Sequence, residues 1–407
     1  MKLYSENKDY KLYQGSMLDM LKVIEPNTID SIVTDPPYEL NFMGKGWDNS
    51  GIAFQKETWK KCYEVLKPGG YLLAFGGSRT FHRIACAIED AGFEIRDTIM
   101  WLYGSGFPKS MNISLMLDKK EGLQKNRGKA INTAGKGERK DIKTSNNTKL
   151  AGVPYNDCKG KLAKQWQGWG TALKPSFEPI IVARKPFKGR LVDNVIEYGV
   201  GGINIDECRV GNEERTYKGA GGSDITVAKG AIGSGIGKDL EFTVNGRFPA
   251  NTILTYDETP SDERLRYFYC AKASKKDRDE GLDTFIEEKV NDGRQTPIDN
   301  AFQRGETLRK NTHPTVKPTD LMQYLVRLVT PSNGIILDPF NGSGSTGKAV
   351  MYENKERNKN YKYIGIELTE EYLPIAKARI EYICNLIEED KLKDKQLSIF
   401  DLESKGE

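Results

Sequence analysis

The sequence predicts an α/β protein: a doubly wound, mostly parallel sheet with a loop-rich module inserted into it. Three observations lead to this prediction. Apolar runs typical of buried strands alternate with helical periodicity over residues 16–103. The same alternation returns after residue 311, whereas residues 189–310 are rich in glycine and polar side chains. A chain of 407 residues that is 38% hydrophobic is also long enough for a full core and a second, smaller module.

The first alternating region begins with a helix start signal. Ser16 and Asp19 have the spacing of a capping box, so a short helix is expected to begin at Ser16. The strand at residues 31–34 ends at Asp35, because the prolines that follow have no N–H to continue a ladder. A helix at 59–66, a turn at 67–70, a strand at 71–75, a helix at 81–91 and a strand at 95–103 complete this region. Strands connected through helices in this way pair in parallel.

The later elements set the domain boundaries. A strand is expected at 178–184; after the glycine-rich region come a helix at 320–329, a strand at 334–338, a glycine-rich turn, a helix from 347 and a strand at 363–367. The predicted core therefore comprises residues 1–110, 175–188 and 311–387. Residues 111–174 are interpreted as a basic flexible insertion, 189–310 as the inserted module and 388–407 as a charged tail.

Positive charge is concentrated in one stretch of the chain. The net charge of the whole chain is +4, which indicates no particular partner. Residues 119–164, however, contain 13 lysines and arginines and only 4 acidic residues, among many Gly, Asn and Thr. This composition is typical of a disordered loop that binds a polyanion, although a solvated insertion without a ligand fits it too.

Several classes of protein are disfavoured by what the sequence lacks. The six cysteines have no CxxC spacing and the chain has two histidines, so no metal site is expected. No apolar run reaches 18 residues, and the first residues lack the apolar stretch of a secretory signal. We therefore expect a cytoplasmic protein that does not span a membrane.

A glycine-rich turn follows the expected strand at 334–338. Backbone N–H groups in such a turn approach nucleotide-like ligands closely. A dinucleotide fingerprint fits through Gly342, Gly344 and Gly347, with Glu367 at the end of the next strand. A phosphate loop does not fit, because Ala349 stands where a hydroxyl would bind magnesium.

Asp338 decides between the two remaining ligands of this turn. Its carboxylate would repel a pyrophosphate at short range, whereas it attracts the ammonium group of S-adenosylmethionine. Glu367 would accept the ribose hydroxyls of either ligand, so it does not discriminate between them. The turn therefore favours S-adenosylmethionine as the cofactor.

The tetrapeptide DPPY at residues 35–38 has the groups that methylation of an aromatic amine requires. Such an amine is a poor nucleophile, because its lone pair is delocalised into the ring. The carboxylate of Asp35 and the carbonyl of Pro36 can each accept one amino N–H and so direct the lone pair toward a methyl donor. The fixed φ of the proline makes this carbonyl rigid, and Tyr38 offers a flat face to a base that has left the duplex. If the strands ending at Asp35 and Asp338 are neighbours where strand order reverses, the two groups face each other.

With DPPY at 35–38, HPTVKP at 313–318, FNGSG at 340–344 and the acidic Glu367, the chain resembles the β-group of DNA amino-methyltransferases. It looks especially like methylases of phages and other mobile elements, through residues 104–110, 174–179 and 269–274. The resemblance covers roughly residues 1–110, 175–186 and 311–385. It implies a Rossmann-like methyltransferase sheet and methylation of adenine N6 in duplex DNA, as in restriction-modification. Cytosine N4 methylation, methylation of RNA and a catalytically silent DNA-binding module remain as alternatives.

The resemblance also implies site residues. The catalytic set is Asp35, Pro36, Pro37 and Tyr38. The cofactor-binding set is Asp338, Pro339, Phe340, Asn341, Gly342, Gly344, Thr346, Glu367, Leu368, Lys317 and Ser16, with Lys317 as a partner for the cofactor carboxylate. The family usually has Gly-Asp where this chain has Gly15-Ser16, so either Ser16 contributes less or Asp19 substitutes for it. His313 and His82 are interpreted as structural residues.

The resemblance further implies a target-recognition role for residues 189–310. Arg264, Arg266, Lys272, Lys275 and Lys276 lie among aromatic residues there and are candidate DNA contacts, although a half-buried strand followed by a solvated helix fits the same pattern. In the tail, residues 396–400 (QLSIF, Gln396 to Phe400) are similar to the motif by which bacterial DNA-handling proteins bind the sliding clamp. An ordinary tail docked on its own domain is the alternative. The sequence also leaves open whether the protein forms a homodimer.

Overall fold

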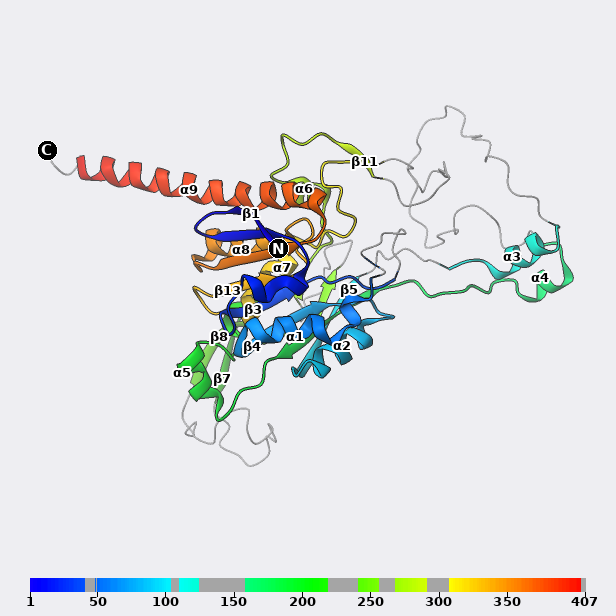
Figure 1. Ribbon diagram of the computed structural model, residues 1–407, viewed down its shortest axis with the longest axis horizontal. Helices are drawn as coiled ribbons and strands as arrows, with labels where there is room; N and C mark the ends of the chain where they lie inside the picture. The colour runs from blue at the N-terminus through cyan, green and yellow to red at the C-terminus, as the bar shows by residue number, and fades with distance from the viewer. Residues whose placement is uncertain are drawn as a thin grey trace.

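A computed structural model describes residues 1–40, 48, 50–103, 110–123, 158–218, 241–255, 268–290 and 307–403. Within these residues the main sheet has ten strands (Figure 1). Their order is β1 (Lys2–Glu6), β2 (Tyr10–Gln14), β14 (Lys362–Glu367), β13 (Ile335–Asp338), β3 (Ile29–Thr34), β4 (Leu66–Phe75), β6 (Phe177–Arg184), β5 (Glu94–Tyr103), β9 (Thr252–Thr255) and β10 (Phe268–Tyr269).

Helices cover both faces of this sheet, which confirms the doubly wound α/β fold. Because successive strand residues point to opposite faces, Leu72 and Ala74 pack with Trp59 in one core cluster, whereas Leu73 and Phe75 belong to the other. The first cluster contains residues of α1 (Lys56–Val65) and α2 (Phe81–Asp90). The second contains residues of α7 (Thr319–Val329), α8 (Ser345–Arg357) and the start of α9 (Leu373–Glu403).

The order of the strands reverses between β3 and β13. From β3 the chain continues through α1 to β4 on one side, and from β13 it continues through α8 to β14 on the other. β3 and β13 are parallel neighbours, with Ile336 opposite Ser31 and Leu337 opposite Ile32. The prediction that the strands ending at Asp35 and Asp338 adjoin is therefore confirmed. Ligands of such sheets bind beyond the carboxyl ends of the strands at this point.

One strand runs against the main direction of the sheet, and one local expectation was wrong. β6 runs antiparallel to both β4 and β5. The chain leaves β5 after Tyr103 and enters β6 at the same end of the strands. β6 must therefore run in the direction opposite to β5. The expected turn at 67–70 is instead part of β4, where Gly69 has φ +82° and the pairing with β3 shifts register.

Residues 189–310, predicted as an inserted module, contact the core at two places in the part that the structure describes. β9 pairs with β5 and so extends the core sheet. The short helix α6 (Lys275–Asp279) is joined to α8, because the buried ammonium of Lys348 lies 2.8 Å from Asp277 Oδ1. The other elements of this region are α5 (Leu191–Tyr198), η5 (Asp206–Cys208), β7 (Val210–Lys218), β8 (Glu241–Arg247), β11 (Glu288–Val290) and β12 (Thr307–Arg309).

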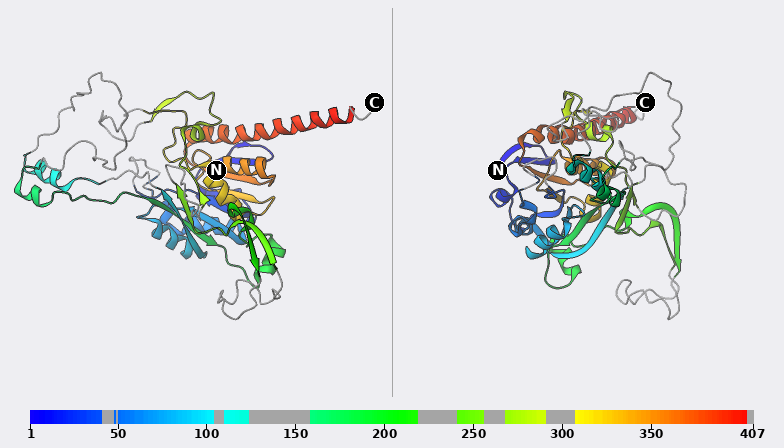
Figure 2. Two further views of the ribbon diagram at one scale, coloured as in Figure 1. Left: turned by 180° about the vertical axis from the view of Figure 1, so that it is seen from behind. Right: turned by 90° about the vertical axis from the view of Figure 1, so that its right-hand side faces the viewer.

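Three remaining features lie at the edges of the molecule. α3 (Ile113–Lys120) and α4 (Lys161–Gln165) project away from the sheet, on the side opposite the C-terminal end of α9 (Figure 2). The predicted charged tail is a continuation of α9 as far as Glu403 rather than a tether. Among the described helices, none combines the length and the apolar character needed to cross a bilayer. The short helices η1 (Met17–Lys22), η4 (Ile52–Phe54) and η6 (Glu370–Tyr372) complete the fold.

Candidate active site

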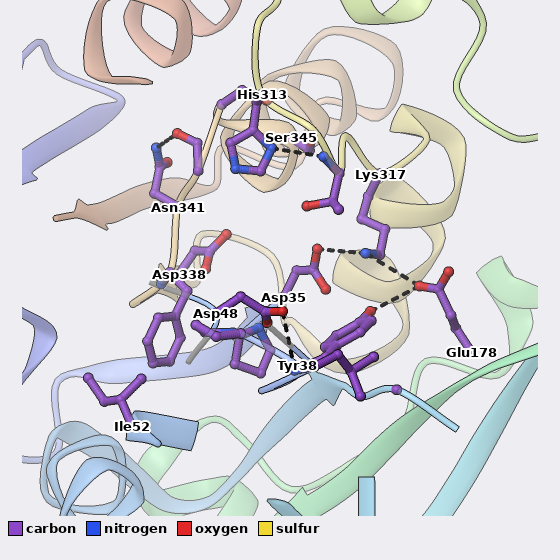
Figure 3. Close-up of a pocket in the computed structure, with 18 of the residues that line it drawn as sticks. Asp35, Tyr38, Asp48, Ile52, Glu178, His313, Lys317, Asp338, Asn341 and Ser345 are labelled. Carbon is purple, nitrogen blue, oxygen red and sulfur yellow. Dashed lines mark hydrogen bonds and ion pairs between the residues drawn. The ribbon is translucent and has the colours of Figure 1, made fainter. Parts of the chain in front are cut away.

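A cavity of about 920 Å³ lies beyond the carboxyl ends of β3, β13 and β14 (Figure 3). Every residue named from the sequence as catalytic or cofactor-binding lines this cavity except Gly344. Gly344 precedes α8 with φ +75° and packs against Ala376 of α9. The topology thus brings the DPPY segment and the glycine-rich turn to opposite walls of one cavity.

The Asp338 carboxylate at the end of β13 is held by three donors of its own chain. The hydroxyls of Thr34 and Thr346 donate to its two oxygens at 2.7 and 2.6 Å. The backbone N–H of Phe340 donates to Oδ1 at 3.1 Å. Burial raises the pKa of Asp338 to about 6, although these hydrogen bonds oppose the shift. A cationic ligand group in the cavity would therefore stabilise the ionised form of Asp338.

Glu367 at the end of β14 is held in the same way. It accepts hydrogen bonds from the backbone N–H groups of Gly342 and Thr369, both at 2.7 Å. Gly342 has φ +51°, and a Cβ there would lie 2.9 Å from Nε2 of His313. Only glycine therefore lets the backbone of the turn approach this wall of the cavity.

Two residues that the sequence did not identify as part of the site hold the glycine-rich turn in place through hydrogen bonds. The guanidinium of Arg379, which is fully buried on α9, donates to the carbonyl of Ser343 at 2.8 Å. The hydroxyl of Tyr363 donates to Oδ1 of Asn341 at 2.7 Å. Neither residue belongs to a local motif, so only the packing of α9 and β14 against the turn identifies them.

The DPPY wall is organised around a lysine. Nζ of Lys317 lies 2.6 Å from Oδ2 of Asp35 and 3.4 Å from Oε2 of Glu178 (Figure 3). The hydroxyl of Tyr38 donates to Oε2 of Glu178 at 2.9 Å. In this structure the ammonium of Lys317, which the resemblance assigns to a cofactor carboxylate, pairs with Asp35 and Glu178. Glu178 was part of a motif used for the family resemblance, but its place in the site was missed.

The charges on this wall support one another. Burial raises the pKa of Asp35, and the neighbouring Lys317 ammonium opposes that shift. Burial disfavours the charge on Lys317, but Asp35 and Glu178 outweigh it and hold its pKa above the usual value. Each group of the pair thus favours the charged form of the other. Oδ1 of Asp35 is buried and has no hydrogen-bond partner among the described residues.

Comparison with known proteins identifies the family of this chain. The family model for DNA methylases matches residues 29–378 of the chain. The chain belongs to the DNA methylase family. It is similar to the type II methyltransferase M.HindIII of Haemophilus influenzae, with 22% identity over 411 residues that cover 91% of this chain and 94% of that protein. It also matches M.HpaI of Haemophilus parainfluenzae, with 34% identity over 115 residues, 26% of this chain and 36% of that protein.

Solved structures with a similar fold include two methyltransferases. The M1.HpyAVI–SAM complex is 16% identical, with a TM-score of 0.39 and coverage of 91% of this chain and 99% of that one. PvuII DNA methyltransferase (cytosine-N4-specific) is 13% identical, with a TM-score of 0.44 and coverage of 95% and 94%. As a member of the DNA methylase family, the chain is a site-specific DNA methyltransferase that uses S-adenosylmethionine. Its glycine-rich turn fits this cofactor, because a side chain at position 342 would close the space against His313.

The remaining predictions at the cavity have different outcomes. Ser16 lines the cavity, and its hydroxyl also caps η1 by accepting from the N–H of Leu18 at 3.3 Å. Asp19 pairs with Lys22 at 2.7 Å outside the cavity, so it does not substitute for Ser16 there. The His313 ring packs edge-on against Tyr372, and burial lowers its pKa to about 3, so it is neutral at physiological pH.

None of the described candidate DNA contacts lines the cavity of the methylase. Lys272 lies over the ring of Tyr103, a residue of the cavity wall, at 3.6 Å. Lys275 pairs with Glu287 at 2.8 Å, and Lys276 is exposed on α6. Arg264 and Arg266 lie outside the described residues. The clamp-like segment lies within α9, and the side chains of residues 397–400 are outside the described part of the chain.

Proposed function

We propose that this methylase transfers the methyl group to N6 of an adenine that has been extruded from duplex DNA. The observation that carries the proposal is Oδ1 of Asp35, which is buried at the cavity and has no hydrogen-bond partner within the part of the chain that the structure describes. A buried acceptor without a partner costs roughly 1–3 kcal/mol, so its presence in a folded protein suggests that a ligand completes it. An amino N–H of the target base has the matching donor.

Lys317 determines which oxygen of Asp35 is available. Because its ammonium engages Oδ2, the carboxylate is fixed with Oδ1 directed to the substrate. One amino N–H would donate to Oδ1 and the other to the carbonyl of Pro36. Both hydrogen bonds draw electron density to nitrogen and orient its lone pair, and they strengthen as positive charge develops there. The nitrogen loses one proton after it is methylated, and Asp35 Oδ1 is placed to accept it.

Tyr38 supplies a rigid face for the base. Its hydroxyl is held by Glu178 and its backbone carbonyl accepts from the Thr80 hydroxyl at 2.8 Å, so the ring is fixed at both ends. A flat ring of this kind suits an unstacked base. We assign the residues of the opposite wall to the cofactor: Asp338 to its ammonium group, and Glu367 to its ribose. Bound S-adenosylmethionine supplies an activated methyl group.

The choice of adenine rests on the DPPY form of the motif. In the family that the chain resembles, DPPY is associated mainly with adenine N6 and SPPY with cytosine N4. A carboxylate is a stronger acceptor than a hydroxyl and cannot compete as a donor. We also assign the recognition of the target site to residues 189–310, since β9 continues the sheet beside Tyr103 and Lys272 approaches the cavity there.

Labelled S-adenosylmethionine, duplex DNA and digestion to nucleosides test the proposal directly. We expect label in N6-methyladenine. Label in N4-methylcytosine would overturn the choice of base. In a parallel reaction with duplex RNA, label in the RNA together with none in the DNA would overturn the choice of substrate. Asp35→Ala should abolish transfer while cofactor affinity, measured by calorimetry, is retained. Asp19→Ala removes a carboxylate outside the cavity and is the matched control, which should methylate normally.

A further inference from the structure

An arm of this methylase lies apart from the packed core. We define the arm as the described residues 110–123 and 158–174, which contain α3 and α4. Its two segments are joined by a bridge between Asn112 and Gly170 and by the Asp118 carboxylate, which accepts from the N–H groups of Lys159 and Gly160, both at 2.8 Å. Asp118 is fully buried in this small unit. The arm is thus a defined structure that projects from the carboxyl ends of β5 and the start of β6 (Figure 2).

The arm has an excess of exposed positive charge. Its described residues include six lysines and two acidic residues, Asp118 and Glu121. Asp118 is used internally, so it does not neutralise the surface. Five of the lysines are exposed and have no ion-pair partner among the described residues: Lys119, Lys120, Lys159, Lys161 and Lys164. Unpaired lysines on one projecting element are typical of a surface that contacts phosphates.

Aromatic and apolar side chains are exposed beside these lysines. Trp166 and Trp169 pack edge to face with ring centroids 5.2 Å apart, yet they are 39% and 59% exposed. The other described tryptophans, Trp59 and Trp101, are buried in the core. Large rings that are left in water next to unpaired cations combine base or sugar contact with phosphate contact. Exposing these rings to water is unfavourable, and a solvated insertion without a ligand gives no compensating contact for them.

The base of the arm reaches the candidate active site. Residues 171–174 line the same cavity as Asp35 and Tyr38. Among them Leu173 is 93% exposed, the highest value of the exposed large hydrophobic residues. A bare leucine at the mouth of a base-binding cavity is placed to contact the duplex where one base has left the stack. Any duplex that delivers a base to Asp35 must therefore pass beside the arm.

We propose that the arm binds duplex DNA next to the extruded base. The lysines of α3 and α4 contact phosphates, and Trp166, Trp169 and Leu173 contact the sugars and the opened base step. This inference rests on the proposed function for the position of the target base, but its binding tests do not require catalysis. It assigns a DNA contact to a part of the chain outside residues 189–310.

The lysine contribution is measured by the salt dependence of binding to a duplex oligonucleotide of arbitrary sequence. Removing one lysine that binds a phosphate makes the slope of log K against log salt shallower by about 0.9. The double variant Lys161→Ala, Lys164→Ala should therefore bind with a slope shallower by about 1.8. The control Lys391→Ala, Lys393→Ala removes the same charge from α9, on the other side of the molecule, and should keep the wild-type slope (Figure 1). An unchanged slope for the arm variant would overturn the proposal.

The aromatic contribution is measured with full-length protein as well. Trp166→Ala, Trp169→Ala should weaken duplex affinity at least about fivefold, whereas Phe at both positions should retain most of it. At saturating DNA the Trp166→Ala, Trp169→Ala variant should still methylate, with a raised KM for DNA and a kcat close to wild type. Wild-type binding of duplex RNA in preference to duplex DNA, lost in the lysine variant, would overturn DNA as the partner. A protein that binds DNA through the arm but never transfers methyl groups would refute the proposed function alone.

Discussion

The two walls of the cavity differ in how completely the chain satisfies their carboxylates. On the cofactor wall, Asp338 accepts three hydrogen bonds and Glu367 accepts two from their own chain. On the DPPY wall, Oδ2 of Asp35 accepts a hydrogen bond from Lys317, whereas Oδ1 has no hydrogen-bond partner among the described residues. The carboxylates beside the glycine-rich turn are therefore satisfied without a ligand, whereas in the proposed function the substrate supplies the missing donor to Asp35.

This difference has a physical reason. Binding a flexible cofactor benefits from a wall whose shape is already fixed, because less ordering entropy is lost. A catalytic acceptor, in contrast, must keep a lone pair for the substrate, and an internal donor would occupy it. The chain meets this need by fixing Asp35 through the oxygen that the substrate does not use.

The largest expected effect comes from exchanging one carboxylate on each wall. In Asp35→Asn the amide oxygen should turn to Lys317, which leaves an NH2 group facing the amino group of the base. We expect kcat to fall by about 10²–10³-fold with cofactor affinity unchanged. Asp338→Asn should instead weaken cofactor affinity about 10–150-fold, as expected for a lost charged hydrogen bond, and leave kcat at saturating cofactor within about tenfold. If both variants changed kcat and cofactor affinity to the same extent, the proposed difference between the two walls would be wrong.

A second prediction concerns the stability of the DPPY wall. Lys317→Met leaves a buried carboxylate without its counter-ion, which typically costs about 3–5 kcal/mol. Burial already raises the pKa of Asp35, and it should rise further without the ammonium. A raised pKa favours the protonated form in the folded state, so stability is lost as pH rises through that pKa. The variant should therefore be less destabilised at pH 5 than at pH 8 in denaturant titrations.

The matched control for this experiment is Glu178→Gln, which removes a charge from the same wall but leaves Asp35 paired with Lys317. It should lose less stability and show a weaker dependence on pH. A loss in Lys317→Met that is the same at both pH values would show that packing, and not the charge on Asp35, explains the effect.

The smallest expected effect is the pH dependence of cofactor binding. With its pKa raised to about 6 by burial, Asp338 is ionised at pH 8 and protonated at pH 5. If the ammonium of the cofactor requires the ionised form, affinity measured by calorimetry should fall about tenfold per pH unit below 6. The protonated form stabilises the folded protein, so unfolding through this group does not explain the loss. The pKa of Glu367 is also raised by burial, and the residual pH dependence of Asp338→Asn reports that contribution.

Local patterns in the sequence determined much of this protein. Apolar runs and the residues that interrupt them placed β5, β13, β14, α2 and α7 within one residue of their observed bounds, and β3 within two, because these elements follow from side-chain periodicity and from the prolines and glycines that end them. DPPY and the glycine-rich turn were identifiable for the same reason, since each keeps its chemistry in a few consecutive residues. The adjacency of β3 and β13, which the sequence analysis assumed as a condition, is observed in the structure.

Only the tertiary structure decided which side chains act on those motifs. Lys317, Glu178 and Arg379 meet their partners across 282, 140 and 36 residues of sequence, and no local signal encodes which distant carboxylate or carbonyl an ammonium or guanidinium will reach. The antiparallel direction of β6 likewise depends on where the chain re-enters the sheet. Periodicity is a property of neighbouring residues, whereas ion pairing and strand direction depend on the path of the whole chain through space.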